Sequence, residues 1–337
     1  MSNRIFLMAM ITMVGSIALA CNIPVFRYAL ERWHPDPCEI LVFHQQDLSA
    51  SEMNVLQGVL PTRVGGSLVK RSVEPAQSLG EVKFVNTTEM AADLRSLWEQ
   101  RKGDAKVDMP YVMVRGDVGP LTQFPLWNGS LAELGQSGVF QSPARKELCR
   151  RLVAGDAVIW LLIAGEDEEA TDEARKQLAE ELPRLSKQIN LPEGIGLPGS
   201  ELYSEVPLLV QFSQLEIDRD DDKEAFLINL FSSIRPEETA RGEPLVVPVF
   251  GRGRALEVIP ASALNSQLMM DLTLFLSGAC SCQVKDQNPG FDLLIDYDWN
   301  QDLFASGDEP PPAKSIKQGR GSGQTPAPQL LDIPPGR

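Results

Sequence analysis

Cysteine is the residue type that offers most chemistry in this chain of 337 residues, which has five cysteines and two histidines. Cys280 and Cys282 stand one residue apart, a spacing that suits binding of a soft metal such as copper(I) or formation of a strained, oxidising disulfide. A metal site would need further ligands beside them. The competing interpretation is that one or both pair with Cys38 or Cys149, or are ordinary loop residues, and spacing alone favours this plainer interpretation.

Other polar clusters indicate structural roles and do not predict a catalytic site. His44 follows an apolar stretch, but no serine or cysteine is spaced to form a nucleophilic motif with it. The run Asp218–Asp222 resembles the start of a calcium loop, but Lys223 replaces the required glycine and Asn229 the required glutamate. Asp220–Asp222 are instead expected to cap and charge the start of the next helix. The sequence therefore predicts no catalytic residue and no cofactor.

A basic run, Gly251-Arg-Gly-Arg254, lies between two apolar stretches. It lacks the third glycine of a phosphate loop and has no helix start to hold an anion. We expect a hairpin turn with an exposed basic tip. Arg252 and Arg254 are then candidate contacts for a partner on an otherwise acidic surface.

The net charge limits the classes of partner. A formal charge of −15 argues against nucleic acid, since phosphate binding needs clustered lysine and arginine. The same charge would be repelled by anionic lipid headgroups. Any attachment to a membrane must therefore be hydrophobic.

The N-terminus has the layout of an export signal. Arg4 precedes the apolar run Ile5–Val14, and Ala18-Leu-Ala20 fits a cleavage site of small residues directly before Cys21. The segment resembles a bacterial lipobox, which implies acylation of Cys21, although Ala18 stands where that motif usually has leucine. Ile5 to Phe26 carries no charge and is also long enough for an uncleaved membrane span.

Simple secretion and a buried N-terminal helix of a cytosolic protein are the remaining alternatives. Export to the periplasmic side of the cell envelope is common to all but the last. Residues 24–33 then predict a short amphipathic helix, with Val25, Phe26 and Leu30 on its apolar face and Arg27 and Glu31 on another. No Gly/Ser tether separates Cys21 from this helix, so the folded body is expected close to the membrane.

From residue 39 onward one order of elements repeats. The expected strands of the two halves are 39–44, 82–86, 111–115 and 126–131, then 157–164, 206–212, 245–250 and 255–259. The expected helices are 50–60, 90–102 and 142–153, then 167–189, 223–234 and 265–276. Each half thus reads β-α-β-α-β-β-α.

This order resembles the thioredoxin-like fold. The resemblance implies an α/β chain with two tandem domains, each with a proline opening its third strand, where Pro110 and Pro244 stand; Met109–Pro110 is a candidate cis bond. Redox members of the family carry Cys-x-x-Cys where the first strand meets its helix. Here those junctions, residues 44–47 and 165–168, hold no cysteine, so both copies are expected to be redox-silent.

The phrases VFRYALERW, VFGRGRAL and GACSCQVKDQNPG also resemble those of exported bacterial proteins, and that likeness implies export without implying an activity. The predicted division has six parts: a signal peptide or membrane anchor (1–21), an amphipathic helix and linker (22–38), two thioredoxin-like domains (39–155 and 156–282), an extension (283–304), and a disordered tail rich in proline and glycine (305–337). Residues 291–299 are expected to add an edge strand or to dock on a partner.

These features favour a non-enzymatic, membrane-anchored scaffold or accessory subunit. The expected partner is another envelope protein or an integral membrane complex such as a transporter, with no nucleic acid. The alternative is a thiol-redox or copper-binding protein that works through Cys280 and Cys282.

Overall fold

The computed structural model describes residues 22–66, 78–102, 107–116 and 125–304. The predictions for residues 1–21, which include acylation of Cys21, and for the tail after residue 304 lie outside these ranges. Within the described ranges, we find no helix that is both long enough and apolar enough to cross a membrane.

The first half of the chain forms a five-stranded mixed sheet with helices around it. Its elements are α1 (Val25–Arg32), β1 (Cys38–His44), α2 (Ala50–Val59), β2 (Val64–Gly65), β3 (Gly80–Asn86), α3 (Ala92–Lys102), β4 (Tyr111–Gly116), β5 (Pro125–Ser130), α4 (Leu131–Leu134) and α5 (Pro143–Ala154).

The second half forms a six-stranded mixed sheet. Its elements are β6 (Val158–Ile163), α6 (Glu168–Gln188), β7 (Phe212–Ile217), η2 (Asp222–Glu224), α7 (Ala225–Ile234), α8 (Pro236–Ala240), β8 (Leu245–Phe250), β9 (Arg254–Ala255), β10 (Ile259–Pro260), η3 (Ala261–Ala263), α9 (Ser266–Ser277), α10 (Cys282–Gln287), β11 (Phe291–Asp292) and α11 (Trp299–Leu303).

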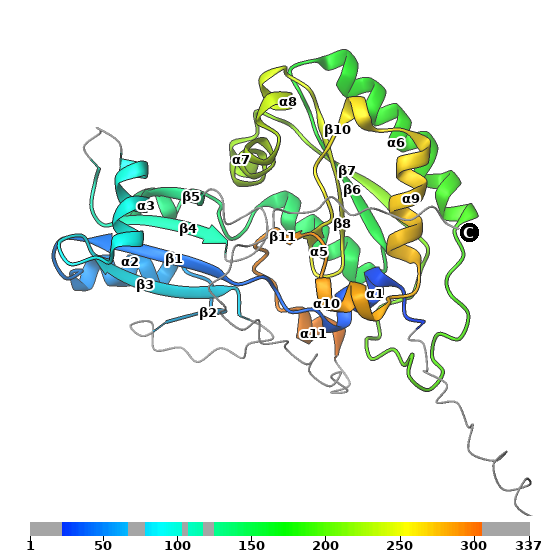
Figure 1. Cartoon of the computed structure of the whole chain (residues 1–337), viewed down its shortest axis with the longest axis horizontal. Coiled ribbons are helices and arrows are strands. Elements are labelled where there is room, and N and C mark those ends of the chain that lie inside the picture. The colour runs from blue at the N-terminus through cyan, green and yellow to red at the C-terminus, as the bar shows by residue number, and fades with distance from the viewer. Residues whose placement is uncertain (1–21, 67–77, 103–106, 117–124, 305–337) are drawn as a thin grey trace, which may run out of the picture.

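The two sheets share one central arrangement. In the first, β3 is parallel to β1, β1 is antiparallel to β4, and β4 is antiparallel to β5. In the second, β7 is parallel to β6, β6 is antiparallel to β8, and β8 is antiparallel to β9. Figure 1 shows the first sheet at the left in blue and cyan and the second at the right. The Met109–Pro110 peptide bond is cis, as expected.

Local sequence signals explain where the helices begin and end. Ser49 and Glu52 form a capping box at the start of α2, and Asp167 accepts a hydrogen bond from the Ala170 amide at the start of α6. Ser142 caps α5, which ends at Gly155 with a φ of 109°. The expected cap by Asp221 is also present, at the start of η2.

The side chains of β6 are buried on both faces of the second sheet because helices cover both faces. Trp160 and its alternate neighbours pack with α6 and α9, whereas Ile159 and Leu161 pack with α7 and α5. Although α5 was expected to close the first domain, it contacts β6 and η2. One continuous cluster of buried side chains therefore includes residues from both halves of the chain.

Two expected strands are placed differently. Instead of one strand at 255–259, the chain has two short strands, β9 and β10, with residues 256–258 between them. The apolar run 206–212 predicts a strand, but β7 begins only at Phe212, which pairs with Val158. The residues before it are drawn toward α1, since the carbonyl of Val206 accepts a hydrogen bond from Arg27. The carbonyl at the start of the expected strand is thus bound by a distant side chain.

Candidate functional site

The first helix carries a charged pair that is buried in the protein. Arg27 and Glu31 are each only 1% exposed, and Arg27 Nε donates to Glu31 Oε1 at 2.7 Å. Positions i and i+4 share one face of a helix, so α1 presents both charges in the same direction. Arg27 and Glu31 lie on one face of α1, as predicted, and that face is buried.

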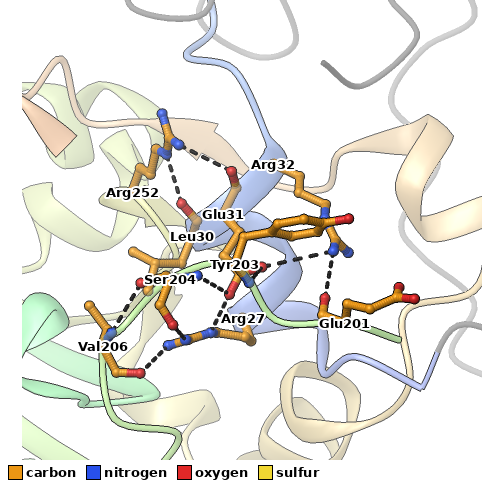
Figure 2. A network of polar contacts seen from close by, with 9 residues as sticks. All are labelled: Arg27, Leu30, Glu31, Arg32, Glu201, Tyr203, Ser204, Val206 and Arg252. Atoms are coloured by element: carbon orange, nitrogen blue, oxygen red, sulfur yellow. Dashed lines mark hydrogen bonds and ion pairs between the residues drawn. The ribbon is translucent and has the colours of Figure 1, made fainter. Parts of the chain in front are cut away.

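The two charges bind one short segment of the loop before β7. Arg27 Nη1 donates to the Val206 carbonyl at 2.7 Å, and its Nη2 donates to the Ser204 carbonyl at 2.6 Å (Figure 2). Glu31 accepts from the amides of Tyr203 and Ser204, both at 3.2 Å. Burial lowers the pKa of Arg27, and the carboxylate of Glu31 opposes that effect. The buried pair is compensated because the two charges bond to each other and to backbone groups of this segment.

The hairpin tip closes the other end of α1. Arg252 Nε donates to the Leu30 carbonyl at 2.7 Å, and its Nη2 donates to the Glu31 carbonyl at 3.2 Å (Figure 2). These carbonyls belong to the last turn of a helix, where they lack helical partners and where the dipole favours a cation. The prediction of an exposed basic tip is therefore wrong, since Arg252 is half-buried and turned toward α1.

Arg254 is turned inward even more completely, at 3% exposed. Its Nη2 lies 3.1 Å from Asp36 Oδ2 and its Nη1 3.3 Å from Asp292 Oδ2. The two aspartates also pair with each other's backbone, because the Asp36 amide donates to Asp292 and the Asp292 amide donates to Asp36. We call Asp36, Arg254 and Asp292 the aspartate clasp. A partner contact by Arg254 at an exposed surface is excluded by its burial.

The aspartate clasp joins three distant parts of the chain: the linker between α1 and β1, the hairpin, and β11. Burial raises the pKa of Asp292 to about 7, with Arg254 acting against the rise and Asp36 adding to it. Burial lowers the pKa of Arg254, but Asp292 and Asp36 raise it above its ordinary value. The clasp thus holds two carboxylates against one guanidinium in a buried place.

The segment after β11 is held by arginines from earlier elements. Arg145 of α5, which is fully buried, donates through Nη1 to the carbonyls of Leu293 at 3.3 Å and Leu294 at 3.1 Å. Arg63, between α2 and β2, donates to the Ile295 carbonyl and lies 3.3 Å from Asp296. Of the two roles expected for residues 291–299, the edge strand is present, because β11 pairs with β9.

The cysteines show a mixed outcome. Cys38 and Cys149 are buried free thiols, and burial raises the pKa of each to about 12, which makes them unreactive. Cys280 is 1% exposed within an apolar cluster, and Cys282 begins α10, where the structure does not describe its side chain. No three potential metal ligands gather among the residues described. Thiol or metal chemistry at this pair stays a prediction.

The two strand–helix junctions that lack Cys-x-x-Cys make different local contacts. His44 Nδ1 lies 3.0 Å from the Gln46 carbonyl. At the second junction, Gly165 packs against the loop before β8, and the Asp167 amide donates to Gly242 at 3.0 Å. Beside it is an open polar hollow of about 660 Å³, lined by acidic residues with Arg175 and Arg219. Both arginines are already bound to carboxylates, Arg175 to Glu216 and Asp172, and Arg219 to Glu166 and Asp220.

Comparison with protein-family models, curated proteins and solved structures finds no match for this chain. The main feature of the site is the attachment of α1, which we call the α1 socket: Arg27 and Glu31, the loop 203–206 and Arg252. Sequence reasoning missed the socket, although an opposite-charge pair at i and i+4 on a helix that is otherwise rich in apolar residues is a visible signal.

Proposed function

We propose that this protein is a membrane-anchored envelope protein that acts as a non-enzymatic scaffold or accessory subunit of a membrane complex. Residues 1–21 would supply the anchor, by acylation of Cys21 or as a membrane span, and the body would lie on the periplasmic side. The expected partner is an integral membrane protein, such as a transporter subunit.

The α1 socket is the observation that carries this proposal. Asn22, the first residue described, is followed almost at once by α1, and α1 is fixed by hydrogen bonds from Arg27, Glu31 and Arg252 to elements of the second half. A buried, fully bonded helix cannot serve as a loose tether. An anchor in residues 1–21 would therefore hold the whole body in a defined position at the membrane, which is what a scaffold requires.

The strand orders support the structural part of the proposal. Both sheets have the central order second–first–third–fourth, with the third strand antiparallel to the first, which is the arrangement of a thioredoxin-like domain. We propose that the two halves are such domains in tandem. Without Cys-x-x-Cys at either junction, their role would be to present surface to a partner.

Affinity capture tests the scaffold. The full chain, tagged at its C-terminus, is extracted from native membranes in mild detergent after covalent cross-linking. We expect an integral membrane protein to co-purify in a fixed ratio. Recovery of the chain alone would contradict the proposal.

A tether variant tests the role of the α1 socket. A Gly/Ser segment of about ten residues, inserted after Cys21, keeps the anchor and the fold but lets the body move away from the membrane. We expect less partner to be captured than with the unaltered chain. The matched control carries the same segment after residue 304, where it should have no effect.

Intact mass of the protein from native membranes distinguishes the two anchors. A chain that begins at Cys21 with added acyl mass supports the lipid anchor, and an unprocessed N-terminus supports the membrane span. A chain cleaved before Cys21 without acyl mass would contradict both.

A further inference from the structure

The loop of residues 190–199, between α6 and β7, lies beside the point where the chain enters the described structure. The Asn22 amide donates to Ser200 Oγ at 2.9 Å. A Cβ placed on Gly194 would come within 2.9 Å of Asn22 Nδ2. The C-terminal end of the apolar N-terminal sequence is therefore in contact with this loop.

The loop is an ordered platform with an apolar tip. Gly194, Gly196 and Gly199 have φ angles of 83°, 85° and 87°, which side chains with a Cβ rarely adopt. The turns are closed by hydrogen bonds from the Leu197 amide to Gly194 at 3.2 Å and from the Ser200 amide to Leu197 at 2.8 Å. Leu197 is 61% exposed, the most exposed of the large apolar side chains in the described part of the chain.

The surface near this exit carries aromatic and basic side chains. The Arg32 guanidinium lies 4.9 Å from the Tyr203 ring and 5.1 Å from the Tyr28 ring, and Lys285 Nζ lies 4.9 Å from the Tyr28 ring. Tyrosine with basic neighbours is typical of the membrane–water interface. Arg32 and Lys285 carry two positive charges here, and Glu193 of the loop and Glu201 beside it carry two negative ones, whereas the whole chain has a net charge of −15.

The acidic end of the second half lies away from the loop. The acidic hollow borders the start of α6, with Glu166, Glu168 and Asp172 in its lining. The loop follows the end of the same helix, whose 21 residues span about 30 Å at 1.5 Å each. A bilayer at the loop would thus meet the near-neutral end, and the acidic hollow would be distant from anionic headgroups.

We propose that residues 190–199 rest on the lipid bilayer, with Leu197 inserted at the boundary between headgroups and acyl chains. The inference rests on the proposed function, since it requires that residues 1–21 anchor the chain. Beyond that function, the inference states which face of the body meets the membrane, and that lipid covers this face. Insertion of an apolar tip beside the anchor gives the body a fixed orientation.

Quenching by brominated lipids tests the contact. The full chain with Leu197→Trp is reconstituted in vesicles of phosphatidylethanolamine and phosphatidylglycerol, with bromine on the acyl chains. Four native tryptophans, Trp33, Trp98, Trp160 and Trp299, are buried, and the unaltered chain measures the background from all five. We expect the added emission to be lost in brominated vesicles relative to vesicles without bromine, and in the unbrominated vesicles to be blue-shifted relative to the same variant without lipid.

Val55→Trp is the matched control, because Val55 is an exposed apolar residue of α2 in the first half. Its added emission should be unquenched. Vesicle flotation separates the two proposals. A chain that fails to float contradicts the anchor and with it the proposed function. A chain that floats, with the added tryptophan at position 197 unquenched, overturns the lipid contact alone and leaves the proposed anchor standing.

Discussion

At the scale of single residues, the protein depends on buried charges whose partners are backbone groups far along the chain. Arg27, Arg145 and Arg254 are each at most 3% exposed, and each donates to carbonyls of loops or extended segments. Arginine suits this role because its planar donor group can bind several oxygens at once. These side chains act as internal fasteners for segments that form little regular structure of their own.

Removal of one member of the Arg27–Glu31 pair should be costly. Arg27→Ala leaves Glu31 buried without its cation, so we expect the free energy of unfolding to fall by about 3–5 kcal/mol. The double variant Arg27→Met with Glu31→Leu removes both charges and should lose clearly less. Urea denaturation measures both. Equal losses in the two variants would show that lost packing, and not the uncompensated charge, is responsible.

The aspartate clasp should make stability depend on pH. Because burial raises the pKa of Asp292 from 3.8 to about 7, the folded protein keeps a proton that the unfolded chain releases. Stability is therefore expected to decrease as pH rises from about 4 to 7, by at most about 1.4 kcal/mol per unit, and to level off above 7.

Asp292→Asn cannot titrate and should lose this decrease, whereas Asp47→Asn, at an exposed position, should keep it. Urea midpoints between pH 4.5 and 7.5 provide the measurement. An unchanged pH dependence in Asp292→Asn would assign the effect to other groups.

At the scale of elements, the short strand β11 fastens the C-terminal extension to the hairpin. It pairs with β9 through Phe291 and Asp292, and the following residues 293–295 are buried between the two halves. Gly290 makes this approach possible, because a Cβ there would lie 2.2 Å from the Ala255 carbonyl oxygen. A backbone atom cannot rotate away from such a contact.

Gly290→Ala should therefore detach this element. Gly196→Ala is the matched control, since its φ of 85° is close to the 88° of Gly290 but nothing lies within 4 Å of its new Cβ. Both variants carry a similar backbone cost, so their difference isolates the clash. We expect Gly290→Ala to be less stable by about 1–3 kcal/mol and to expose residues 291–304 to limited proteolysis. Equal stability and equal cleavage would show that β11 is not a fastening element.

At the scale of the whole molecule, the two halves share one core. The cluster that includes Ile40 of β1 and Leu131 of α4 continues through Leu148 of α5 to Ile159 of β6 and Leu293 after β11. The aspartate clasp and Arg63 connect the same regions through polar contacts. Two domains that share their interior lose independent stability.

Unfolding should therefore be one cooperative transition. Calorimetry is expected to give a single peak with equal calorimetric and van't Hoff enthalpies. A chain that ends at residue 304 should behave the same, because the shared core lies before that point. A chain that ends at Gly290 should show a lower midpoint or two separate transitions. Two transitions in the full chain would contradict the coupling.

Most secondary structure could be predicted from the sequence because its signals are local. The 3.6-residue period of α6, the Ser142-Pro143 start of α5 and the uninterrupted apolar run of β6 each act within a few residues. The strand expected at 206–212 is one exception, and the carbonyl of Val206 at its start accepts a hydrogen bond from Arg27, which lies 179 positions away. No local pattern records such a partner.

The α1 socket and the aspartate clasp were decided only by the tertiary structure. A charged side chain in a sequence predicts a solvent-exposed position, because burial of an unpaired charge is costly. The partners that make burial tolerable for Arg27 and Arg254 lie on other elements, and only folding brings them within 3.3 Å. The sequence by itself determined the α/β elements, the acidic charge and the absence of Cys-x-x-Cys. The fold alone decided which arginines face inward, because that choice depends on which distant carbonyls and carboxylates packing brings to them.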